Sequence, residues 1–389
     1  MKTVDVAIIG AGLAGLQCAK LVSAQGATVL LVDRKNDLAT GIHTTGIFVR
    51  KTLEDYYFPA GTLGKPIRDV SLYSPKLKRL DLRSNKDEFR VGKMGELYKA
   101  LLCECLEGGV EFAKGTRYVS SVCEDGKALV RLEKGGTAFH VAAKVLVGAD
   151  GANSRVARDL GLDENREWIV GYEEVYRSSS TEFDPRLHCF LDAELAPGYL
   201  AWIADDCEEV HVGVGGYAAD FDPRKALESF KTRNPTLFDF TNERPMETRG
   251  GRIPVGGVLR RIANQHGLLI GDAAGAVSPL TGGGLDPCLR LSSFAANIIA
   301  ERLRSGDDGI LLQYSGGLFR ARFISRLWMR RTMALFKSQT LIEIGFVFLC
   351  TNLGSRFAKH IFFGRGSFPD VNQLAIKGVG PRDREMVQT

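Results

Sequence analysis

The sequence lacks the features that mark metal-binding, secreted and nucleic-acid-binding proteins. Its eight cysteines are scattered and none of them forms a CxxC pair, so we expect no metal site. No secretory signal precedes the first apolar stretch, "VDVAIIG", which predicts reduced thiols and a cytoplasmic protein. The formal net charge is only +5, and zinc-finger and RNA-binding patterns are missing, so we expect no nucleic-acid partner.

The chain is longer than one ordinary domain. Its 389 residues predict two or three interlocked domains. Hydrophobic residues make up 44% of the sequence and charged residues 25%, which is the balance of a globular protein with a sizeable core.

Hydrophobic periodicity divides the chain into three regions. Residues 4–9 and 28–34 read as buried strands, and a helical pattern over residues 14–25 joins them into a βαβ unit. From about residue 168 to 254, short strands alternate with turn residues, which predicts a separate antiparallel sheet. From residue 285 to about 363 the pattern is mainly helical. The expected fold class is therefore α/β.

A glycine-rich turn follows the first predicted strand. In "GAGLAG", Gly10, Gly12 and Gly15 open the first helix, and Asp33 ends the next strand. Such glycines let backbone amides approach a pyrophosphate at a helix N-terminus, and an acidic residue at that position accepts from a ribose hydroxyl. The alternative is a tight turn with no ligand. The whole fingerprint favours dinucleotide binding, but it does not distinguish NAD from FAD.

Two later turns resemble the second and third FAD motifs of the flavoprotein hydroxylase superfamily. They are "VLVGADGANSRVAR" and "LLIGDAAGAVSPLTGGG". The resemblance implies a Rossmann-like FAD-binding domain and FAD as cofactor, with NAD(P)H or another reductant as electron donor. It also implies that Asp272, after Gly271, hydrogen-bonds the ribityl chain, and that the turn of Asp150 and Gly151 supports the cofactor.

The same resemblance assigns roles to a lysine and to a run of glycines. Lys93 stands where the superfamily usually has an arginine near the flavin phosphates. The backbone amides of Gly282, Gly283 and Gly284 would lie against the pyrimidine side of the flavin. The helix that follows them would point its N-terminal dipole at the negative charge of a reduced flavin. The role of Asp286, near the hydroxylases' usual asparagine, is left open.

Within that superfamily, three segments resemble the geranylgeranyl reductase branch. They are "GDAAGAVSPLTGGG", "APGYLAWIADDCEEVHVGVGG" and "GGRIPVGG". The resemblance implies a FAD-dependent oxidoreductase that reduces carbon–carbon double bonds of an isoprenoid or other apolar substrate by hydride transfer from flavin N5. One alternative is a FAD-dependent monooxygenase, a hydroxylase or epoxidase, of an aromatic or polyketide-like molecule. Another is a flavin-binding protein without enzymatic activity.

Three side chains are candidates for the reaction site. Tyr199 and Trp202 have large amphipathic rings suited to an apolar chain, although ordinary core packing of a strand explains them equally well. His43 lies in the loop expected near the flavin ring, where it could act as a proton donor. The alternative is a polar loop residue with an ordinary hydrogen bond.

The resemblance also sets the expected domains. The FAD-binding domain would comprise residues 1–165 and 255–305, an interleaved antiparallel sheet for the substrate 166–254, and a C-terminal helical region 306–389. Residues 320–337 of that region are basic, with interleaved apolar residues. They suit either docking helices with a solvated basic face or a peripheral membrane contact, which would fit a prenyl lipid substrate.

Overall fold

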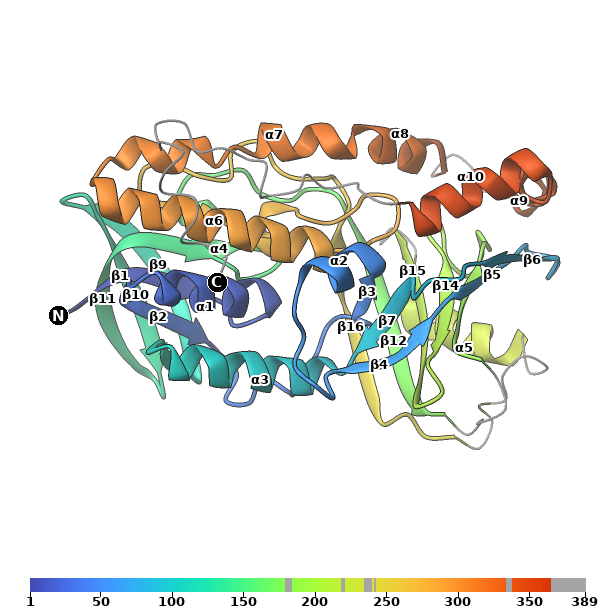
Figure 1. The fold of residues 1–389 in the computed structure, drawn as a ribbon, viewed down its shortest axis with the longest axis horizontal. Coiled ribbons are helices and arrows are strands. Elements are labelled where there is room, and N and C mark those ends of the chain that lie inside the picture. The colour runs from blue at the N-terminus through green and yellow to red at the C-terminus, as the bar shows by residue number, and fades with distance from the viewer. Residues whose placement is uncertain (179–183, 218–220, 234–239, 241–242, 334–337, 365–389) are drawn as a thin grey trace.

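The computed structural model describes residues 1–178, 184–217, 221–233, 240, 243–333 and 338–364. Figure 1 shows two sheet-containing halves side by side along the longest axis, with C-terminal helices along one edge of both. Lys337 and residues 365–389, which belong to the predicted C-terminal region, lie outside the described residues.

The first half holds a seven-stranded sheet in the order β8-β2-β1-β11-β10-β9, with β17 paired to β11. Strands β1, β2, β8, β11 and β17 run parallel where they pair, and β9 and β10 form an antiparallel extension. Their bounds are β1 Lys2–Ile9, β2 Val29–Asp33, β8 Glu111–Lys114, β9 Thr116–Glu124, β10 Lys127–Lys134, β11 Thr137–Gly148 and β17 Gly267–Leu269.

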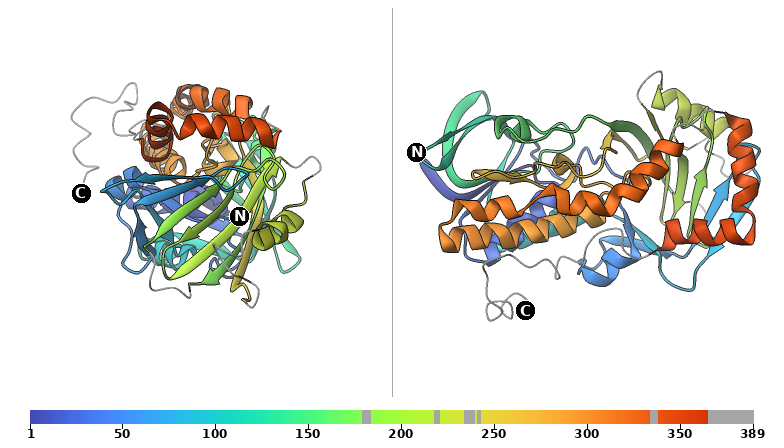
Figure 2. Two further views of the ribbon diagram at one scale, coloured as in Figure 1. Left: turned by 90° about the vertical axis from the view of Figure 1, so that its right-hand side faces the viewer. Right: turned by 90° about the horizontal axis from the view of Figure 1, so that it is seen from above.

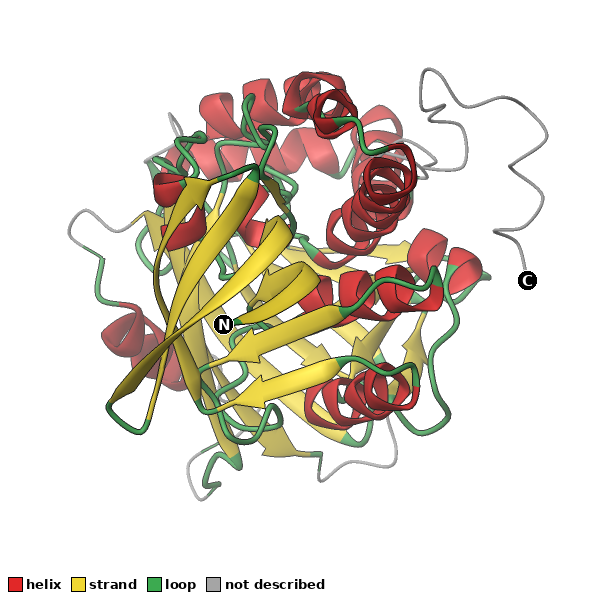
Figure 3. Cartoon of the chain, turned by 90° about the vertical axis from the view of Figure 1, so that its left-hand side faces the viewer, coloured by secondary structure: helices red, strands yellow, loops and turns green. Residues whose placement is uncertain are grey.

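Three helices pack in this half. The helix α1 packs against α6 and α3, and Figure 3, which views the molecule from this end, shows the sheet in front with helices beside it. Their bounds are α1 Leu13–Ala24, α3 Met94–Glu107 and α6 Leu285–Ser305, and the short α4 is Arg155–Asp159. The predicted βαβ unit is confirmed to within one residue at every boundary except the start of β1, where two exposed residues extend the strand without adding apolar surface.

The second half holds another seven-stranded sheet, in the order β16-β12-β15-β14-β13-β5-β6. The helix α5, Pro223–Arg233, packs against β12 and β15. The strand bounds are β5 Asp69–Tyr73, β6 Arg79–Arg83, β12 Trp168–Arg177, β13 Arg186–Phe190, β14 Ala201–Asp205, β15 Glu209–Tyr217 and β16 Glu247–Pro254.

This sheet differs from the predicted substrate domain, residues 166–254, in one respect. Strands β5 and β6 come from the N-terminal region that we had assigned to the FAD-binding domain, and β5 pairs in parallel with β13. Neighbouring strands are joined by backbone hydrogen bonds, which every residue type except proline can form. The sequence of one strand therefore does not indicate which other strand will pair with it. A small sheet in the order β3-β7-β4 lies between the halves, with β3 Ile47–Val49, β4 Leu63–Ile67, β7 Phe89–Gly92 and the helix α2 Arg50–Asp55.

The C-terminal helices run from the first half to the second. After α6 come α7 Gly316–Arg320, α8 Ile324–Met333, α9 Gln339–Leu349 and α10 Asn352–Phe363, with 3₁₀ turns at Gly271–Ala274, Asp308–Gln313 and Ala321–Phe323. In Figure 2, α9 and α10 wrap the far end of the second sheet. None of the described helices is by itself both long and apolar enough to cross a bilayer, but α9 and α10 meet that test as a pair bent by 98°.

Candidate cofactor and substrate cavity

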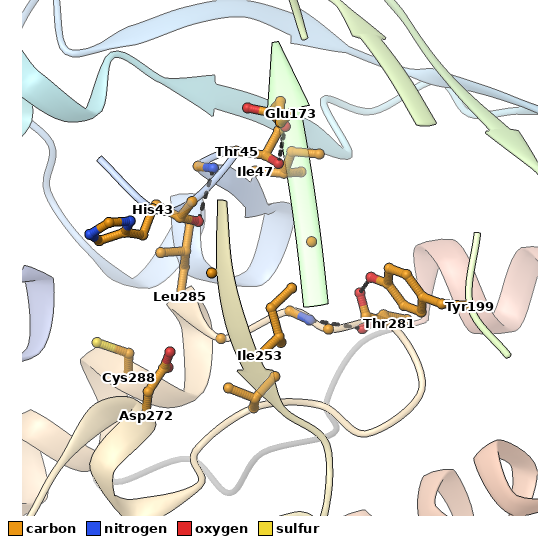
Figure 4. A pocket seen from close by; sticks show the side chains of 18 of the residues that line it. His43, Thr45, Ile47, Glu173, Tyr199, Ile253, Asp272, Thr281, Leu285 and Cys288 are labelled. Carbon is orange, nitrogen blue, oxygen red and sulfur yellow. Dashed lines mark hydrogen bonds between the residues drawn. The ribbon is translucent and has the colours of Figure 1, made fainter. Parts of the chain in front are cut away.

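One cavity of about 1520 Å³ joins the two halves of the molecule. It begins at the glycine turn after β1, passes between the two large sheets, and ends under α9 and α10. Figure 4 shows a close view of this cavity, with side chains from the glycine turns and from the second sheet around it.

The first glycine turn packs tightly on one side and is open on the other. A Cβ at Gly15 would overlap the carbonyl oxygen of Gly10, and a Cβ at Gly10 would overlap the carbonyl oxygen of Ala149. At Gly12, by contrast, no described atom lies within 4 Å of the position that a Cβ would take. That space belongs to the cavity and lies at the N-terminus of α1, where a phosphate group is favoured.

Asp33 is fixed beside this turn. Its Oδ2 accepts the backbone N–H of Ala11 at 2.8 Å, and its Oδ1 accepts that of Lys35 at 2.8 Å. All three residues line the same end of the cavity. The carboxylate therefore stands where a dinucleotide presents its ribose hydroxyls.

The carboxylate of Asp150 stabilises the second turn through hydrogen bonds. Asp150 Oδ1 accepts the hydroxyl of Ser154 at 2.6 Å, and Oδ2 accepts the backbone N–H of Arg155 at 2.8 Å, so the residue caps α4. Gly151 has φ +84°, which favours glycine. Both residues line the cavity, and Asp150 shapes the wall while its carboxylate oxygens bond within the turn.

The third turn presents a carboxyl group to the cavity. Gly271 has φ +58°, and a Cβ there would lie 2.8 Å from the Cβ of Ala14, so this turn packs directly on α1. Asp272 lines the cavity beside it, and burial raises the pKa of its carboxyl group to about 6. A desolvated carboxyl group gains from hydroxyl partners, which the ribityl chain of a flavin would supply.

The run of three glycines forms a loop that leads into α6. The loop is closed by the backbone bonds from Gly282 N–H to Ser278 O and from Ser278 N–H to Gly283 O, both 2.9 Å. Gly282, Gly283 and Gly284 all line the cavity, and α6 begins directly after them at Leu285. The Gly282 and Gly283 amides are bonded within the loop, the latter to Thr281 Oγ1 at 3.4 Å, and the loop and the helix N-terminus line the same space.

Asp286 links two helices. Its Oδ1 accepts hydrogen bonds from the Thr52 hydroxyl and from Arg290 Nε, each 2.9 Å long. Arg290 also donates to Asp55 at 2.7 Å. This cluster ties the first turn of α6 to α2 and thereby fixes where the glycine loop ends.

Two predicted cofactor residues, both in the described part of the chain, are absent from the cavity lining: Gly15, which packs on the Gly10 carbonyl, and Lys93. The Nζ of Lys93 lies 2.6 Å from Glu208 Oε2, and neither side chain belongs to the cavity lining among the described residues. The carboxylate of Glu208 holds the ammonium group at the surface, so the predicted contact with a flavin phosphate stays a prediction.

The rings of Tyr199 and Trp202 pack edge to face, with their planes 76° apart, over two glycines of the second sheet. A Cβ at Gly213 would overlap the ring of Trp202, and a Cβ at Gly215 would lie 2.7 Å from Tyr199 Cδ1. Gly213 faces Trp202 directly in the register of β14 and β15. The glycines on β15 therefore leave the space that the two aromatic rings occupy. Both rings line the cavity.

Tyr199 and His43 approach the cavity from different elements. The Tyr199 hydroxyl donates to the Thr281 carbonyl at 2.5 Å, which ties the second sheet to the glycine loop. His43 Nδ1 lies 2.9 Å from the Gly250 carbonyl. Because a carbonyl only accepts, Nδ1 carries a proton, so only doubly protonated His43 can donate from Nε2. Figure 4 shows His43 and Tyr199 on opposite sides of the view.

Sequence reasoning missed a buried cluster of charged residues in the second sheet. Glu173, His211 and Arg249 lie on adjacent strands of the same face, and Glu173 accepts hydrogen bonds from Thr45 and from Trp202 Nε1. The signal was present in "GYEEVY", "EVHVG" and "ETRGG", where charged residues recur in strands that are otherwise apolar or glycine-rich. Charges in such strands are rarely buried without partners.

The far end of the cavity is apolar. It is formed by side chains of the second sheet on one side and of α9 and α10 on the other. These are Leu72, Leu187, Cys189, Leu191, Leu341, Ile342, Phe346, Phe348, Leu349, Phe357, Ala358, Ile361, Phe362 and Phe363. A long hydrocarbon would meet almost no polar atom here.

The fold and the cavity define a dinucleotide-binding α/β protein with an apolar second compartment. The open space at Gly12, the carboxylate of Asp33, the carboxyl group of Asp272 and the amides of the glycine loop fit FAD in one continuous site. The family model described as "FAD binding domain" matches residues 3–322. The chain belongs to this family, and FAD is its cofactor.

Known proteins support the predicted branch. Digeranylgeranylglycerophospholipid reductase of Methanosarcina acetivorans is 28% identical over 325 residues, which span 78% of this chain and 76% of the relative. A geranylgeranyl bacteriochlorophyll reductase-like structure from Thermoplasma acidophilum has a TM-score of 0.81 at 18% identity, over 100% of this chain and 96% of that one. The predicted resemblance and the α/β flavoprotein fold are thereby confirmed.

The same fold serves other flavin chemistry. p-Nitrophenol 4-monooxygenase of Pseudomonas putida has a TM-score of 0.70 at 15% identity, over 94% of this chain and 98% of that one. Fold by itself therefore does not choose between reductase and monooxygenase.

Proposed function

We propose that this protein is a FAD-dependent reductase that saturates carbon–carbon double bonds in the prenyl chains of a lipid. The observation that carries the proposal is the continuity of the cavity, which leads from the glycine turns to an apolar compartment long enough to pass under two helices. The names of the related reductases support the same substrate class.

The chain's own residues would hold the cofactor at defined points. The first turn and the N-terminus of α1 would bind its pyrophosphate, Asp33 a ribose, and Asp272 the ribityl hydroxyls. The glycine loop would place its amides and the start of α6 against the ring. When bound and reduced, FAD supplies the hydride for the reaction.

Other residues would shape the reaction site. Trp202 and Tyr199 would form one wall for the alkene, and the apolar lining would exclude water around it. His43, doubly protonated and donating from Nε2, is one candidate for the proton donor to the alkene, and Thr45, which also lines the cavity, is the other.

We also propose that NAD(P)H or another external reductant supplies the electrons. Among the described residues the dinucleotide fingerprint occurs once, at the FAD site. Bleaching of the bound flavin's visible absorbance by NADH, NADPH or dithionite under anaerobic conditions ranks the donors. A flavin that only dithionite bleaches would overturn the NAD(P)H assignment.

The reductase proposal is tested with the FAD-loaded protein, reduced under anaerobic conditions and mixed with a phospholipid that carries geranylgeranyl chains. The expected product gains two hydrogens for each double bond reduced, as measured by mass spectrometry. A product that gains oxygen, and forms only in air, would overturn the proposal in favour of the monooxygenase.

We further propose that α9 and α10 contact a lipid surface. Ile344, Val347 and Leu353 are exposed outside the cavity lining, and Leu341, Phe348 and Phe357 are exposed and also line the cavity. Arg356, Lys359 and His360 of α10 are exposed beside them. Apolar and basic residues together are typical of helices that lie in a membrane interface. The inner sides of the same helices line the cavity, so a lipid chain would have a short path into it.

The basic segment of residues 320–337 contributes less positive charge to this surface than its sequence suggests. Three of its arginines turn inward, since Arg320 donates to the Val258 carbonyl, Arg326 to Ser278 and Arg330 to Tyr217.

Flotation with vesicles that contain anionic phospholipid tests the proposed lipid contact of α9 and α10. Ile344→Ser combined with Phe348→Ser is expected to abolish flotation, and unchanged flotation would refute the contact.

A further inference from the structure

Glu173, His211 and Glu209 form a buried line of ionisable side chains in the second sheet. His211 Nδ1 lies 3.1 Å from Glu173 Oε1, and His211 Nε2 lies 3.3 Å from Glu209 Oε2. His211 has no exposed surface and Glu173 is 3% exposed. The imidazole ring is thus held between two carboxylates, one on each nitrogen.

One end of this line reaches the cavity. The Thr45 hydroxyl donates to Glu173 Oε2, and Trp202 Nε1 donates to the same oxygen at 2.9 Å. Thr45, Glu173 and Trp202 all line the cavity, and Figure 4 shows Thr45 beside Glu173 with the hydrogen bond between them. At the other end, the side chain of Glu209 is 30% exposed.

The charges around His211 keep it protonated. Burial by itself lowers the pKa of His211, but the hydrogen bond to Glu173 and the nearby Glu209 carboxylate outweigh burial and raise it to about 9. Arg249, whose Nη1 lies 3.8 Å from Glu173 Oε1, opposes this shift.

The two glutamates remain ionised. Burial raises the pKa of Glu173, but the hydrogen bond and the charge of His211 outweigh it and the pKa is lowered. The His211 ring, whose Nε2 lies 3.3 Å from Glu209 Oε2, also lowers the pKa of Glu209, and Lys93 helps to lower it from the surface side. Asp206 is the other acidic group that faces His211. At neutral pH the cluster therefore contains an imidazolium ion and carboxylates.

We propose that Glu173, His211 and Glu209 store a proton beside the cavity and deliver it through Thr45 to the alkene. The proposal rests on the proposed reductase function, because only the saturation of a double bond needs this proton. It concerns a group of residues to which the sequence assigned no role.

The atoms and electrons balance as follows. One alkene carbon would take a hydride, with both electrons, which FAD supplies when it is bound and reduced, and the π bond would break. His211 first gives its Nδ1 proton to Glu173, whose neutral carboxyl group then turns to donate to the Thr45 oxygen. The Thr45 hydroxyl, released from its hydrogen bond to Glu173, gives its own proton to the other alkene carbon. His211 keeps its Nε2 proton, which Glu209 holds in place. After the product leaves, water in the cavity restores the proton by the reverse path.

The chain offers a matched control for the central glutamate. Glu174 follows Glu173 on β12 and points to the opposite face, where it is also buried and pairs with Lys231 at 2.8 Å. Glu174→Gln removes a buried charge from the same strand without touching the cluster. Thr45→Val removes the hydroxyl from a loop outside the sheet, so it tests the path even if Glu173→Gln fails to fold.

The test is a single turnover of the FAD-loaded, reduced protein with a geranylgeranyl phospholipid in the absence of oxygen, followed by flavin absorbance. Thr45→Val and Glu173→Gln are each expected to slow flavin re-oxidation about 100-fold, which is typical of a lost acid catalyst, with FAD content unchanged. Glu174→Gln is expected to react like the wild type. The wild-type rate should also fall as the pH rises through the pKa of His211.

A second readout needs no substrate. Histidine-selective NMR is expected to show one ring that titrates near pH 9 in the wild type and at lower pH in Glu173→Gln. If the wild type reduces the lipid and both variants match its rate, or if no histidine titrates near that pH, the proton store is refuted while the reductase stands. If the wild type reduces no alkene, the proposed function fails and the proton store fails with it.

Discussion

The two ends of the cavity are built in different ways. At the cofactor end, three strand-to-helix turns contribute glycine backbone, and each turn is complete within a short stretch of sequence, as at Gly10 to Gly15. At the substrate end, side chains from β12, β14, β15 and β16 meet across the sheet, as Glu173, Trp202 and Arg249 do. The cofactor end depends on local backbone shape, and the substrate end depends on register between distant strands.

The largest effect on stability is expected at Gly15, where the first glycine turn leaves no space for a side chain. A Cβ in Gly15→Ala would overlap the backbone of Gly10, and this backbone cannot move without displacing β11. We expect a loss of about 3 kcal/mol or more in the free energy of unfolding, measured in urea, and loss of bound FAD. Gly12→Val is the control, since its side chain would enter the cavity. It should keep the stability and lose FAD, and equal stability of the two variants would contradict this account.

The next largest effect is expected at the substrate end. In Gly213→Ala the new methyl group would push the Trp202 ring off the sheet. We expect turnover of the lipid to fall about 10-fold or more while FAD content stays that of the wild type. Adding Gly213→Ala to Trp202→Ala should have little further effect, because the clash is then gone. Parallel loss of FAD would show that the two ends are not separable.

A smaller effect is expected in the loop between the two ends. In Gly283→Val the nearest atom to the new Cβ would be Thr281 Oγ1 at 3.3 Å, so the fold should tolerate the change. The side chain would nevertheless stand where the loop faces the flavin. We expect FAD affinity to fall about 10-fold or the flavin midpoint potential to shift, as measured by titration. Wild-type values of both would refute the role of this loop.

A change of pH acts on the buried ion cluster at the substrate end. The pKa of His211 is raised from 6.5 to about 9 in the folded protein, so its stabilising contribution is present below pH 6.5 and is lost as the pH rises through 9. Between pH 7 and pH 9.5 the wild type should lose on the order of 2 kcal/mol of unfolding free energy more than His211→Gln. Identical slopes in urea titrations of the two proteins would contradict the buried ion cluster.

The cofactor end could be predicted because its signals are local. "GAGLAG" contains the glycines and lies between a strand and a helix, and the predicted start of a helix near Leu285 agrees with α6. The two later turns also face the same cavity as the first. The exception is Lys93, whose partner Glu208 comes from another strand connection and could not be seen in the segment around the lysine.

The sequence by itself determined the βαβ unit, the three glycine turns and the order of the three regions, because each follows from hydrophobic periodicity and glycine geometry within a few residues. Only the tertiary structure decided which residues meet across the second sheet. It placed β5 and β6 beside β13, joined Glu173 to His211 and Thr45, and turned Arg330 inward. The physical reason is that strand register and the burial of charge are set by partners far away in the chain.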